Sequence, residues 1–213
     1  MILLTGFEPF GQETVNPSWG AVQLATEILR AQGLLAEAVE LPCVFGQSLA
    51  VLSEAVSRFS PEVVVCAGLA GGRERLSLER VAINCDDARI PDNKGQRPID
   101  EEVVPGAPAA YFSSLPIKAA LQNLRIAGIR GEISQSAGTY VCNHVFYGLM
   151  HSLASLPGVR GGFVHVPYLP EQVPTDGAFP SMPLEVTAQG IAVIARTALE
   201  TREDAKMAAG AIH

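Results

Sequence analysis

The stretch EVVVCAG, residues 62–68, places four consecutive apolar side chains after a glutamate and before an alanine and a glycine. A strand with one face in water alternates apolar and polar residues, whereas a strand covered on both faces is apolar throughout. The stretch therefore predicts a buried strand in a parallel sheet that carries helices on both faces.

The segments around this stretch alternate between strand and helix patterns. Further strands are expected at residues 1–5, 35–42, 78–85, 131–137 and 161–168. Helices are expected at residues 15–33, 46–59 and 115–128, from 139 onward, and within 183–208, beginning near Leu184. This alternation predicts one domain over residues 1–213 of the α/β class, a three-layer α/β/α sandwich with a mostly parallel central sheet.

Two segments carry more specific local signals. In the first helix, Asn16 suits the N-cap, Pro17 the first turn and Gly33 the end. The stretch 86–112 is rich in Pro, Gly, Asp and Asn and is too long for an idle connection. We expect it to be a functional loop or to hold a small hairpin.

The composition excludes several classes of function. The 213 residues are 48% hydrophobic, their net charge is −7, and no Lys/Arg cluster occurs, so nucleic acid and anionic membranes are poor partners. No apolar run is long enough for a membrane span, and the N-terminus MILLTGFEPFG lacks the basic part of a signal peptide. The widely spaced cysteines, without a CxxC, favour reduced thiols in a cytoplasm. They are Cys43, Cys66 and Cys85, for which we expect packing roles, and Cys142.

The stretch SAGTYVCNHVFYGLMHSL, residues 136–153, places Cys142 where an amphipathic helix begins after a predicted strand. With Thr139 as the N-cap, Cys142 lies in the first turn. The free N–H groups and the helix dipole there favour a thiolate, so we expect a lowered thiol pKa and a nucleophilic sulfur. Ligands in open α/β sheets also gather at the carboxyl ends of strands. The alternative is a small core residue, the usual role of cysteine.

A catalytic thiolate needs an imidazole that shares its proton. His144 is two residues from Cys142 on the same helix and points elsewhere. His151 lies beyond the second turn, and His213 ends the chain, where we expect disorder. His165, in GFVHVPY near the end of a predicted strand, is the candidate base, with a hydrogen-bonded core histidine as an equal alternative.

Glu79 is expected on the apolar side of the predicted strand 78–85, together with Val81 and Ile83. A carboxylate in such a place is costly unless it is paired. It is either a strand-end residue that touches water, the partner of an arginine, or the third member of a relay that orients the His165 ring.

A metal site is a weaker alternative use of the same thiol. Its ligands would be Cys142, His144 and His151, spaced two and then seven residues apart. This spacing does not converge on one tetrahedral centre, so we expect no metal.

Several long motifs resemble one known family. They are TGFEPFG…NPS (5–18), AGGR (70–73), ERVAIN (79–84), DARIPDN (87–93), AYFSSLPIK (110–118), SAGTYVCNH (136–144) and GGFVHVPYLPEQ (161–172). The chain resembles the pyroglutamyl peptidase I family, the pyrrolidone-carboxylate peptidases, from residue 2 to about residue 200.

The resemblance implies a cysteine peptidase that removes N-terminal pyroglutamate from peptides without a metal or cofactor. By resemblance Cys142, His165 and Glu79 are catalytic, and Arg89 belongs to the oxyanion region. It also implies the α/β/α fold and a homo-oligomer, commonly a tetramer in microbial members.

Pyroglutamate is a neutral lactam, so its pocket needs an apolar slot with a few hydrogen bonds. By resemblance Phe7 and Phe10 form the aromatic wall, and backbone groups near Leu69 and Val141 meet the lactam. Phe7 and Phe10 have loop anchoring as an alternative role. For Asn16, a family loop residue, we favour the structural role of an N-cap.

The long loop carries Arg89 and Ile90 and is expected to flank the site or to make a subunit contact. Leu69, Tyr140 and Cys43 depart from the Gln, Phe and Thr of some relatives, which puts substrate preference in doubt. Two other functions stay open. One is a thiol amidase or esterase acting on another small acyl group, and the other is a non-catalytic lactam-binding protein.

Overall fold

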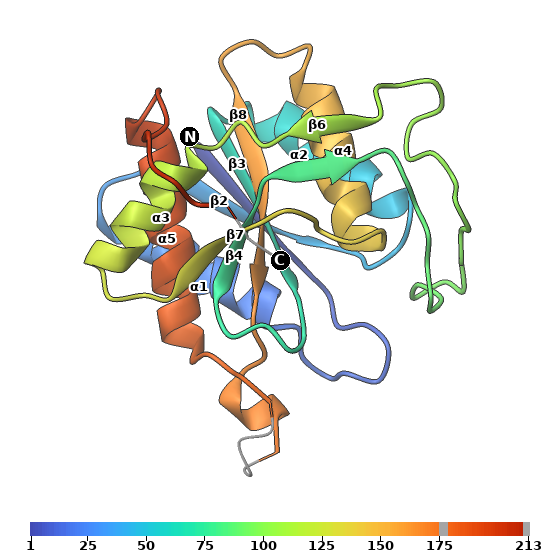
Figure 1. Ribbon diagram of the computed structural model, residues 1–213, viewed down its shortest axis with the longest axis horizontal. Coiled ribbons are helices and arrows are strands. Elements are labelled where there is room, and N and C mark those ends of the chain that lie inside the picture. The colour runs from blue at the N-terminus through green and yellow to red at the C-terminus, as the bar shows by residue number, and fades with distance from the viewer. Residues whose placement is uncertain (175–178, 211–213) are drawn as a thin grey trace.

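A six-stranded sheet in the order β2-β1-β3-β8-β4-β7 forms the centre of the computed structural model, which describes residues 1–174 and 179–210 (Figure 1). Its strands are β1 (Ile2–Phe7), β2 (Ala36–Leu41), β3 (Val63–Leu69), β4 (Leu76–Glu79), β7 (Gly131–Ser134) and β8 (Arg160–Val166). A separate small sheet pairs β5 (Val81–Ile83) with β6 (Ala110–Phe112). The helices are α1 (Pro17–Ala31), α2 (Gln47–Phe59), α3 (Ile117–Ile126), α4 (Val141–Leu153) and α5 (Leu184–Glu200), with a short 3-10 helix η1 (Pro170–Gln172).

The apolar stretch at residues 62–68 provides most of β3, every residue of which is buried. β3 pairs in parallel with β1 on one side and with β8 on the other, and β1 pairs in parallel with β2. The remaining pairing is different, because β4 runs antiparallel to β8, with Ser77 opposite His165. β7 is parallel to β4, so β4 and β7 both run against the other four strands. The sheet is therefore mostly parallel, with one reversed pair at its edge.

The predicted strand 78–85 is wrong as a single element. The chain leaves the central sheet at Arg80, whose backbone N–H still donates to Ser134 O at 2.9 Å. From Val81 onward it pairs with Phe112 in the small sheet instead. Glu79 and Val81 therefore belong to different sheets, and the predicted common face does not exist. The two strands also differ in burial, because every residue of β4 is buried whereas Val81 and Ile83 of β5 are partly exposed.

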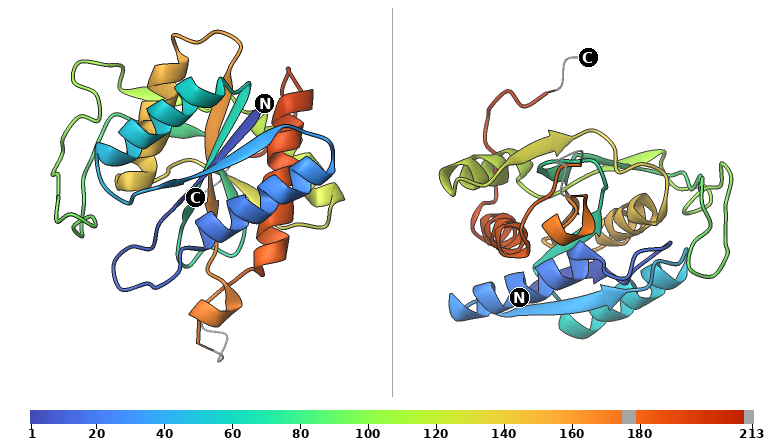
Figure 2. Two further views of the ribbon diagram at one scale, coloured as in Figure 1. Left: turned by 180° about the vertical axis from the view of Figure 1, so that it is seen from behind. Right: turned by 90° about the horizontal axis from the view of Figure 1, so that it is seen from below.

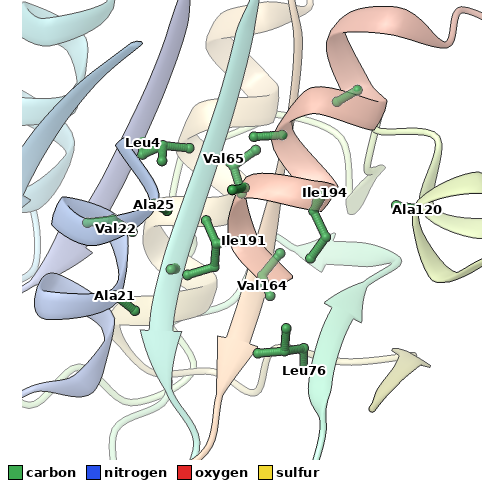
Figure 3. Packing of buried hydrophobic residues seen from close by; sticks show 14 of the residues in the cluster. Leu4, Ala21, Val22, Ala25, Val65, Leu76, Ala120, Val164, Ile191 and Ile194 are labelled. Atoms are coloured by element: carbon green, nitrogen blue, oxygen red, sulfur yellow. The ribbon is translucent and has the colours of Figure 1, made fainter. Parts of the chain in front are cut away.

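The helices cover both faces of the sheet and make three layers (Figure 2). α1, α3 and α5 pack on one face, where Leu4, Val65 and Val164 meet Ile191 and Ile194 of α5 (Figure 3). α2 and α4 pack on the opposite face in a second apolar cluster. The predicted α/β/α sandwich is confirmed.

The ends of α1 follow the sequence signals. The side-chain oxygen of Asn16 accepts a hydrogen bond from Ser18 N at 3.1 Å, and Pro17 is the first helical residue. This cap satisfies one of the N–H groups that a helix start leaves free. Gly33, just after the helix, has a φ of 79°, a conformation that glycine adopts at little cost. Asn16 therefore has the structural role that the sequence favours.

Two connecting segments bear on the site and on the tail. Residues 84–109 form a long loop between β5 and β6, drawn in green where it extends from the sheet in Figure 1. The expected functional loop thus also closes a small hairpin. α5 begins at Leu184 as expected and ends at Glu200, and the charged segment after it is not helical. There Asp204 caps α3 by accepting from Lys118 N at 3.0 Å and Ala119 N at 2.9 Å. Among the described helices, none is long and apolar enough to cross a bilayer.

Candidate active site

A cavity of about 170 Å³ opens where the carboxyl ends of β1, β3 and β8 meet the start of α4. It is lined by Phe7, Phe10, Asn16, Cys43, Leu69, Ala137, Tyr140, Cys142 and His165. Most of these side chains are apolar, and two thiols and one imidazole are among them. The cavity therefore suits a small, uncharged group held beside a nucleophile.

Cys142 reaches the cavity because the strand beneath it carries no side chain at the point of contact. A Cβ atom at Gly68 would lie 2.8 Å from Cys142 Sγ, closer than real Cβ atoms come. Gly68 is paired with His165 across β3 and β8, which places the imidazole on the neighbouring strand at the same level. The fold thus brings together the thiol and the imidazole that the sequence singled out.

The start of α4 differs by one residue from the expected one. The N-cap is Tyr140 rather than Thr139, because the Thr139 hydroxyl donates to Asp87 O at 2.8 Å and is engaged with the long loop. Cys142 is still in the first turn. Within the described residues, no acceptor is found for the backbone N–H groups of residues 141, 142 and 143. These donors are available to an anionic group beside the thiol.

Burial raises the pKa of the Cys142 thiol, and the neighbouring Cys43 and Glu79 raise it further. Arg73 has the opposite effect on the same thiol. The helix start was expected to lower the pKa of this thiol, but burial outweighs that effect in the resting protein. Removing a thiolate from water destabilises it more than the helix start stabilises it. The resting group is a neutral thiol that needs a proton acceptor.

His165 is oriented by a buried carboxylate. Its Nδ1 and the Oε1 atom of Glu79 are 2.7 Å apart, and Glu79 is fully buried. A carboxylate only accepts hydrogen bonds, so Nδ1 carries the proton and Nε2 is left as the acceptor. Burial lowers the pKa of His165, while the bond to Glu79 partly raises it. The ring is therefore neutral at rest and can take the thiol proton.

Glu79 also has the arginine partner that the sequence left open as an alternative. Arg73 Nη1 donates to the same Oε1 atom at 2.7 Å. Glu79 is thus the partner of an arginine, and its bond to His165 has the geometry that a relay member would need. Glu79 does not approach His165 from a neighbouring carboxyl end of the sheet. β4 runs antiparallel to β8, so the carboxyl ends of these two strands point in opposite directions.

The same reversal corrects the expected placement of Cys142. The strand that precedes it, β7, is parallel to β4 and therefore antiparallel to β8. Its carboxyl end therefore points in the direction opposite to those of β3 and β8. Residues 135–140 carry the chain back across the face of the sheet, so that α4 begins over Gly68.

Arg89 and Ile90 line a second hollow next to the cavity rather than the cavity itself. This hollow is formed by Asp87, Arg89, Ile90, Gly138, Thr139 and Tyr140. Tyr140 belongs to both, and its hydroxyl donates to Pro91 O at 3.1 Å. The loop that carries Arg89 is thus fastened to the residues just before Cys142.

The other candidate pocket residues divide into two groups. Phe7, Phe10, Leu69 and Tyr140 line the cavity, and so does Asn16 in addition to its capping role. Val141 is fully buried, and no acceptor for its backbone N–H group is found among the described residues.

The remaining histidines have partners outside the cavity. His144 Nδ1 lies 2.7 Å from Asp86 Oδ2, and its Nε2 accepts from Gly46 N at 2.9 Å. His151 Nδ1 lies 3.0 Å from the Tyr111 hydroxyl. Both therefore hold α4 to its neighbours, and His213 lies outside the described residues.

The sequence did not place Ala137 or Arg73 in the site, and it predicted a packing role for Cys43. Cys43 and Ala137 line the cavity. Burial raises the pKa of Cys43 to about 12, so this thiol stays neutral and contributes only to the lining. Arg73 touches Glu79 and was not assigned a role. The AGGR motif that contains it was a visible signal, but its spacing to Glu79 does not reveal the contact.

Comparisons with known proteins agree with this geometry. A family model of pyroglutamyl peptidase matches residues 1–201. The pyrrolidone-carboxylate peptidase of Escherichia fergusonii is 52% identical, covering 100% of this chain and 99% of the relative. That of Streptomyces coelicolor is 52% identical with the same coverage. The crystal structure of Bacillus amyloliquefaciens pyroglutamyl peptidase I superposes with a TM-score of 0.90 at 44% identity, covering 96% of this chain and 98% of the other.

Proposed function

This chain belongs to the pyroglutamyl peptidase family, and we propose that Cys142, His165 and Glu79 carry out the family's reaction in it. The chain is a pyroglutamyl-peptidase I, a hydrolase that removes N-terminal pyroglutamate from peptides. One observation supports the assignment of residues most directly. His165 is fixed by a 2.7 Å bond to buried Glu79 while it borders the cavity that contains Cys142.

The reaction begins with two neutral groups. As Cys142 Sγ attacks the carbonyl carbon that joins pyroglutamate to the next residue, its proton passes to Nε2 of His165. The new C–S bond turns the carbonyl oxygen into an oxyanion. Glu79 stabilises the imidazolium that forms and holds the ring in one tautomer.

The oxyanion needs donors that are already in place. Among the described residues, no acceptor is found for the backbone N–H groups of Cys142 and Asn143, which lie in the same first turn of α4 as the thiol. Donors fixed before the reaction stabilise developing charge without reorganisation. Arg89, in the adjacent hollow, supplies a cation on the same side as Tyr140, consistent with the role that the resemblance gives it.

In the second half of the reaction, His165 gives its proton to the leaving group and then passes a proton from water to the sulfur. The imidazolium of His165 donates its proton to the departing amide nitrogen, the C–N bond breaks, and a pyroglutamyl thioester remains on Cys142. Water then attacks the thioester carbonyl and gives a proton to His165. The C–S bond breaks, the sulfur regains that proton, and free pyroglutamate leaves.

The cavity accounts for the choice of substrate. Pyroglutamate has no ammonium group, and the described lining of the cavity includes no carboxylate that would select one. Phe7, Phe10 and Leu69 offer apolar surface to the ring, and the free N–H of Val141 and the backbone at Leu69 would meet the lactam. Tyr140 closes the side toward Ile90, while Asn16 orders the loop that carries Phe10.

Three broader assignments belong to the same proposal. The enzyme works in the cytoplasm, where its four free cysteines and its thiol nucleophile stay reduced. It is a homo-oligomer, a tetramer by the family resemblance, which light scattering coupled to gel filtration would measure. Residues 1–213 act as one peptidase domain, since one central sheet collects strands from Ile2 to Val166.

One experiment tests the central assignment. Pyroglutamyl, prolyl and glutamyl amides of a single fluorophore are offered to the wild type and to Cys142→Ala, with and without a thiol reductant. We expect cleavage of the pyroglutamyl amide alone, only by the wild type, and faster with reductant. The matched control, Cys85→Ala, removes a half-buried thiol outside the cavity and should retain activity. Preference for the prolyl amide, or full activity of Cys142→Ala, would contradict the proposal.

A further inference from the structure

We propose that Arg73 is a positioning residue of this reaction, which clamps the Glu79 carboxylate for His165 and ties it to the loop that leads to Cys142. The proposal rests on the proposed function, because it concerns how that triad is held. Arg73 does not line the cavity, and it acts through its contact with Glu79 and through its charge.

The contacts of Glu79 are unusual because they converge on one oxygen. Oε1 accepts from His165 Nδ1 and from Arg73 Nη1, each at 2.7 Å. The other oxygen, Oε2, is buried and has no hydrogen-bond partner among the described residues. Without Arg73, a single hydrogen bond to a neutral ring would hold the carboxylate. Glu79 would then be free to rotate about that bond and would be a buried charge without a counter-ion.

A second contact of Arg73 connects the triad across the fold. Its Nη2 donates to Ser136 O at 3.3 Å, in the segment that leads from β7 to Cys142. One guanidinium thus bridges the carboxylate behind His165 and the approach to the nucleophile. A planar fork with several donors can make both contacts, whereas an ammonium makes one of them well.

The AGGR motif has a shape that places this guanidinium. The N–H of Arg73 donates to Ala70 O at 3.3 Å and closes a tight turn. Gly72 has a φ of +85°, which favours glycine, and a Cβ at Gly71 would lie 2.6 Å from the ring of Tyr168. Both glycines are therefore required for the turn that leads to Arg73. The motif has no other role in the reaction, which supports a role in positioning.

The positive charge of Arg73 should have a measurable effect on the pKa values of His165 and Cys142. The charged and titratable groups that face the reacting pair are Glu79, Arg73, Cys43, Cys66 and Tyr140. Arg73 is the one cation among these groups, and it lowers the pKa of both His165 and Cys142. Its removal should therefore raise both pKa values, in addition to loosening Glu79.

The test compares Arg73→Met and Arg73→Lys with a matched control. Arg75 stands two residues along the same loop and pairs with Glu74 at 2.9 Å, so Arg75→Met removes an exposed ion pair that does not touch the triad. In Arg73→Met we expect kcat/KM for a pyroglutamyl amide to fall by about 10²-fold. The acid limb of its pH profile should move up by about one unit. In Arg73→Lys the acid limb should stay near its wild-type pH. Arg75→Met should change neither kcat/KM nor the pH of the acid limb.

A double variant separates positioning from general damage. If Arg73 acts through Glu79, Arg73→Met in a Glu79→Gln background should cost no more than about twofold beyond Glu79→Gln alone. Independent, multiplying losses would overturn the proposal. So would an Arg73→Met enzyme with wild-type kcat/KM, or one that loses activity with an unmoved acid limb.

A readout without substrate keeps this test apart from that of the proposed function. The rate of iodoacetamide alkylation at Cys142, followed by peptide mass against pH, reports the thiolate directly. The profile should move to higher pH in Arg73→Met and stay in place in Arg75→Met. An unmoved profile overturns the role of Arg73 even if the wild type cleaves pyroglutamyl amides. Failure of the wild type to cleave them would instead contradict the proposed function.

Discussion

Gly68 on β3 lies directly beneath the thiol of Cys142, and a Cβ atom at this position would stand 2.8 Å from Sγ. The same atom would stand 2.9 Å from Cζ of Phe163 on β8. The thiol of Cys142 therefore occupies a space that exists only because one residue of the central strand has no side chain. This close approach sets where Sγ points relative to His165.

The first prediction is that Gly68→Ala displaces the thiol or the Phe163 ring. Because misplacement of reacting groups is costly, we expect kcat/KM to fall by about 10²-fold. Overpacking should also lower the free energy of unfolding by about 1–3 kcal/mol. Kinetics with a pyroglutamyl amide and urea denaturation measure the two effects.

Gly20→Ala is the control for this substitution. Gly20 lies within α1, and an added Cβ would approach only the flexible end of Leu184, at 3.3 Å. It should leave activity unchanged. A Gly68→Ala enzyme with wild-type kcat/KM would show that the observed position of the thiol is not the reacting one.

The second prediction concerns the bond between Glu79 and His165. Glu79→Gln keeps the shape of the side chain but removes the charge that stabilises the imidazolium and fixes its tautomer. We expect kcat to fall by about 10²–10⁴-fold, less than in Cys142→Ala, because orientation is only one contribution. Steady-state kinetics on folded protein, checked by circular dichroism, measure the loss.

Glu132→Gln is the matched control, because Glu132 accepts from the Ser77 hydroxyl at 2.9 Å on the strand beside Glu79 and does not bond to His165. It should change kcat by less than about twofold, as do most substitutions outside such networks. Equal losses in the two variants would remove the special role of Glu79.

The third prediction is that Tyr140→Phe loosens the long loop without harming the chemistry. The tyrosine hydroxyl donates to Pro91 O at 3.1 Å and fastens the segment that carries Arg89 and Ile90. We expect KM to rise by a small factor, kcat to persist, and unfolding free energy to fall by about 0.5–1.5 kcal/mol.

Tyr147→Phe is the control, since the Tyr147 hydroxyl donates to Pro108 O near the other end of the same loop, away from the cavity. It should cost comparable stability but leave KM unchanged. If KM rose equally in both variants, the contact at Pro91 would have no particular influence on substrate binding.

The layers of the fold were predictable because they depend on local patterns. The apolar run of β3 reflects cover on both faces, and Asn16 and Pro17 mark a helix start by backbone chemistry alone. The reversed direction of β4 was not predictable. It depends on which distant strand Ser77 meets, and its partner His165 is far along the chain. The same long-range choice splits the predicted strand after Glu79.

In the candidate site, too, what depends on residue type was predictable, and what depends on the folded chain was not. A thiol, an imidazole and a carboxylate each allow few chemical roles. The family resemblance matched Cys142, His165 and Glu79 to catalytic positions. The direction of the thiol pKa was wrong because burial, a property of the folded chain, outweighs the local effect of the helix start. Arg73 was missed because a turn, rather than a regular strand, carries it to Glu79.

The fourth prediction is the pH dependence of kcat/KM. His165 must be neutral to accept the thiol proton, so activity falls as pH drops through its pKa. Burial lowers that pKa from its ordinary value of 6.5, so the acid limb should lie below pH 6.5. Burial raises the pKa of Cys142 from its ordinary value of 9.0, so the alkaline limb should lie above pH 9. Rates measured across this range, at constant ionic strength, give both limbs.

Glu79→Gln provides the internal check on this assignment. The Glu79 carboxylate raises the pKa of His165, so its neutralisation should move the acid limb to still lower pH. Loss of the Arg73 cation should move the same limb in the opposite direction. Because both groups contact the buried site, added salt should screen these shifts only weakly. An acid limb that does not respond to Glu79→Gln would mean that His165 is not the group that titrates, and the imidazole would lose its place in the reaction.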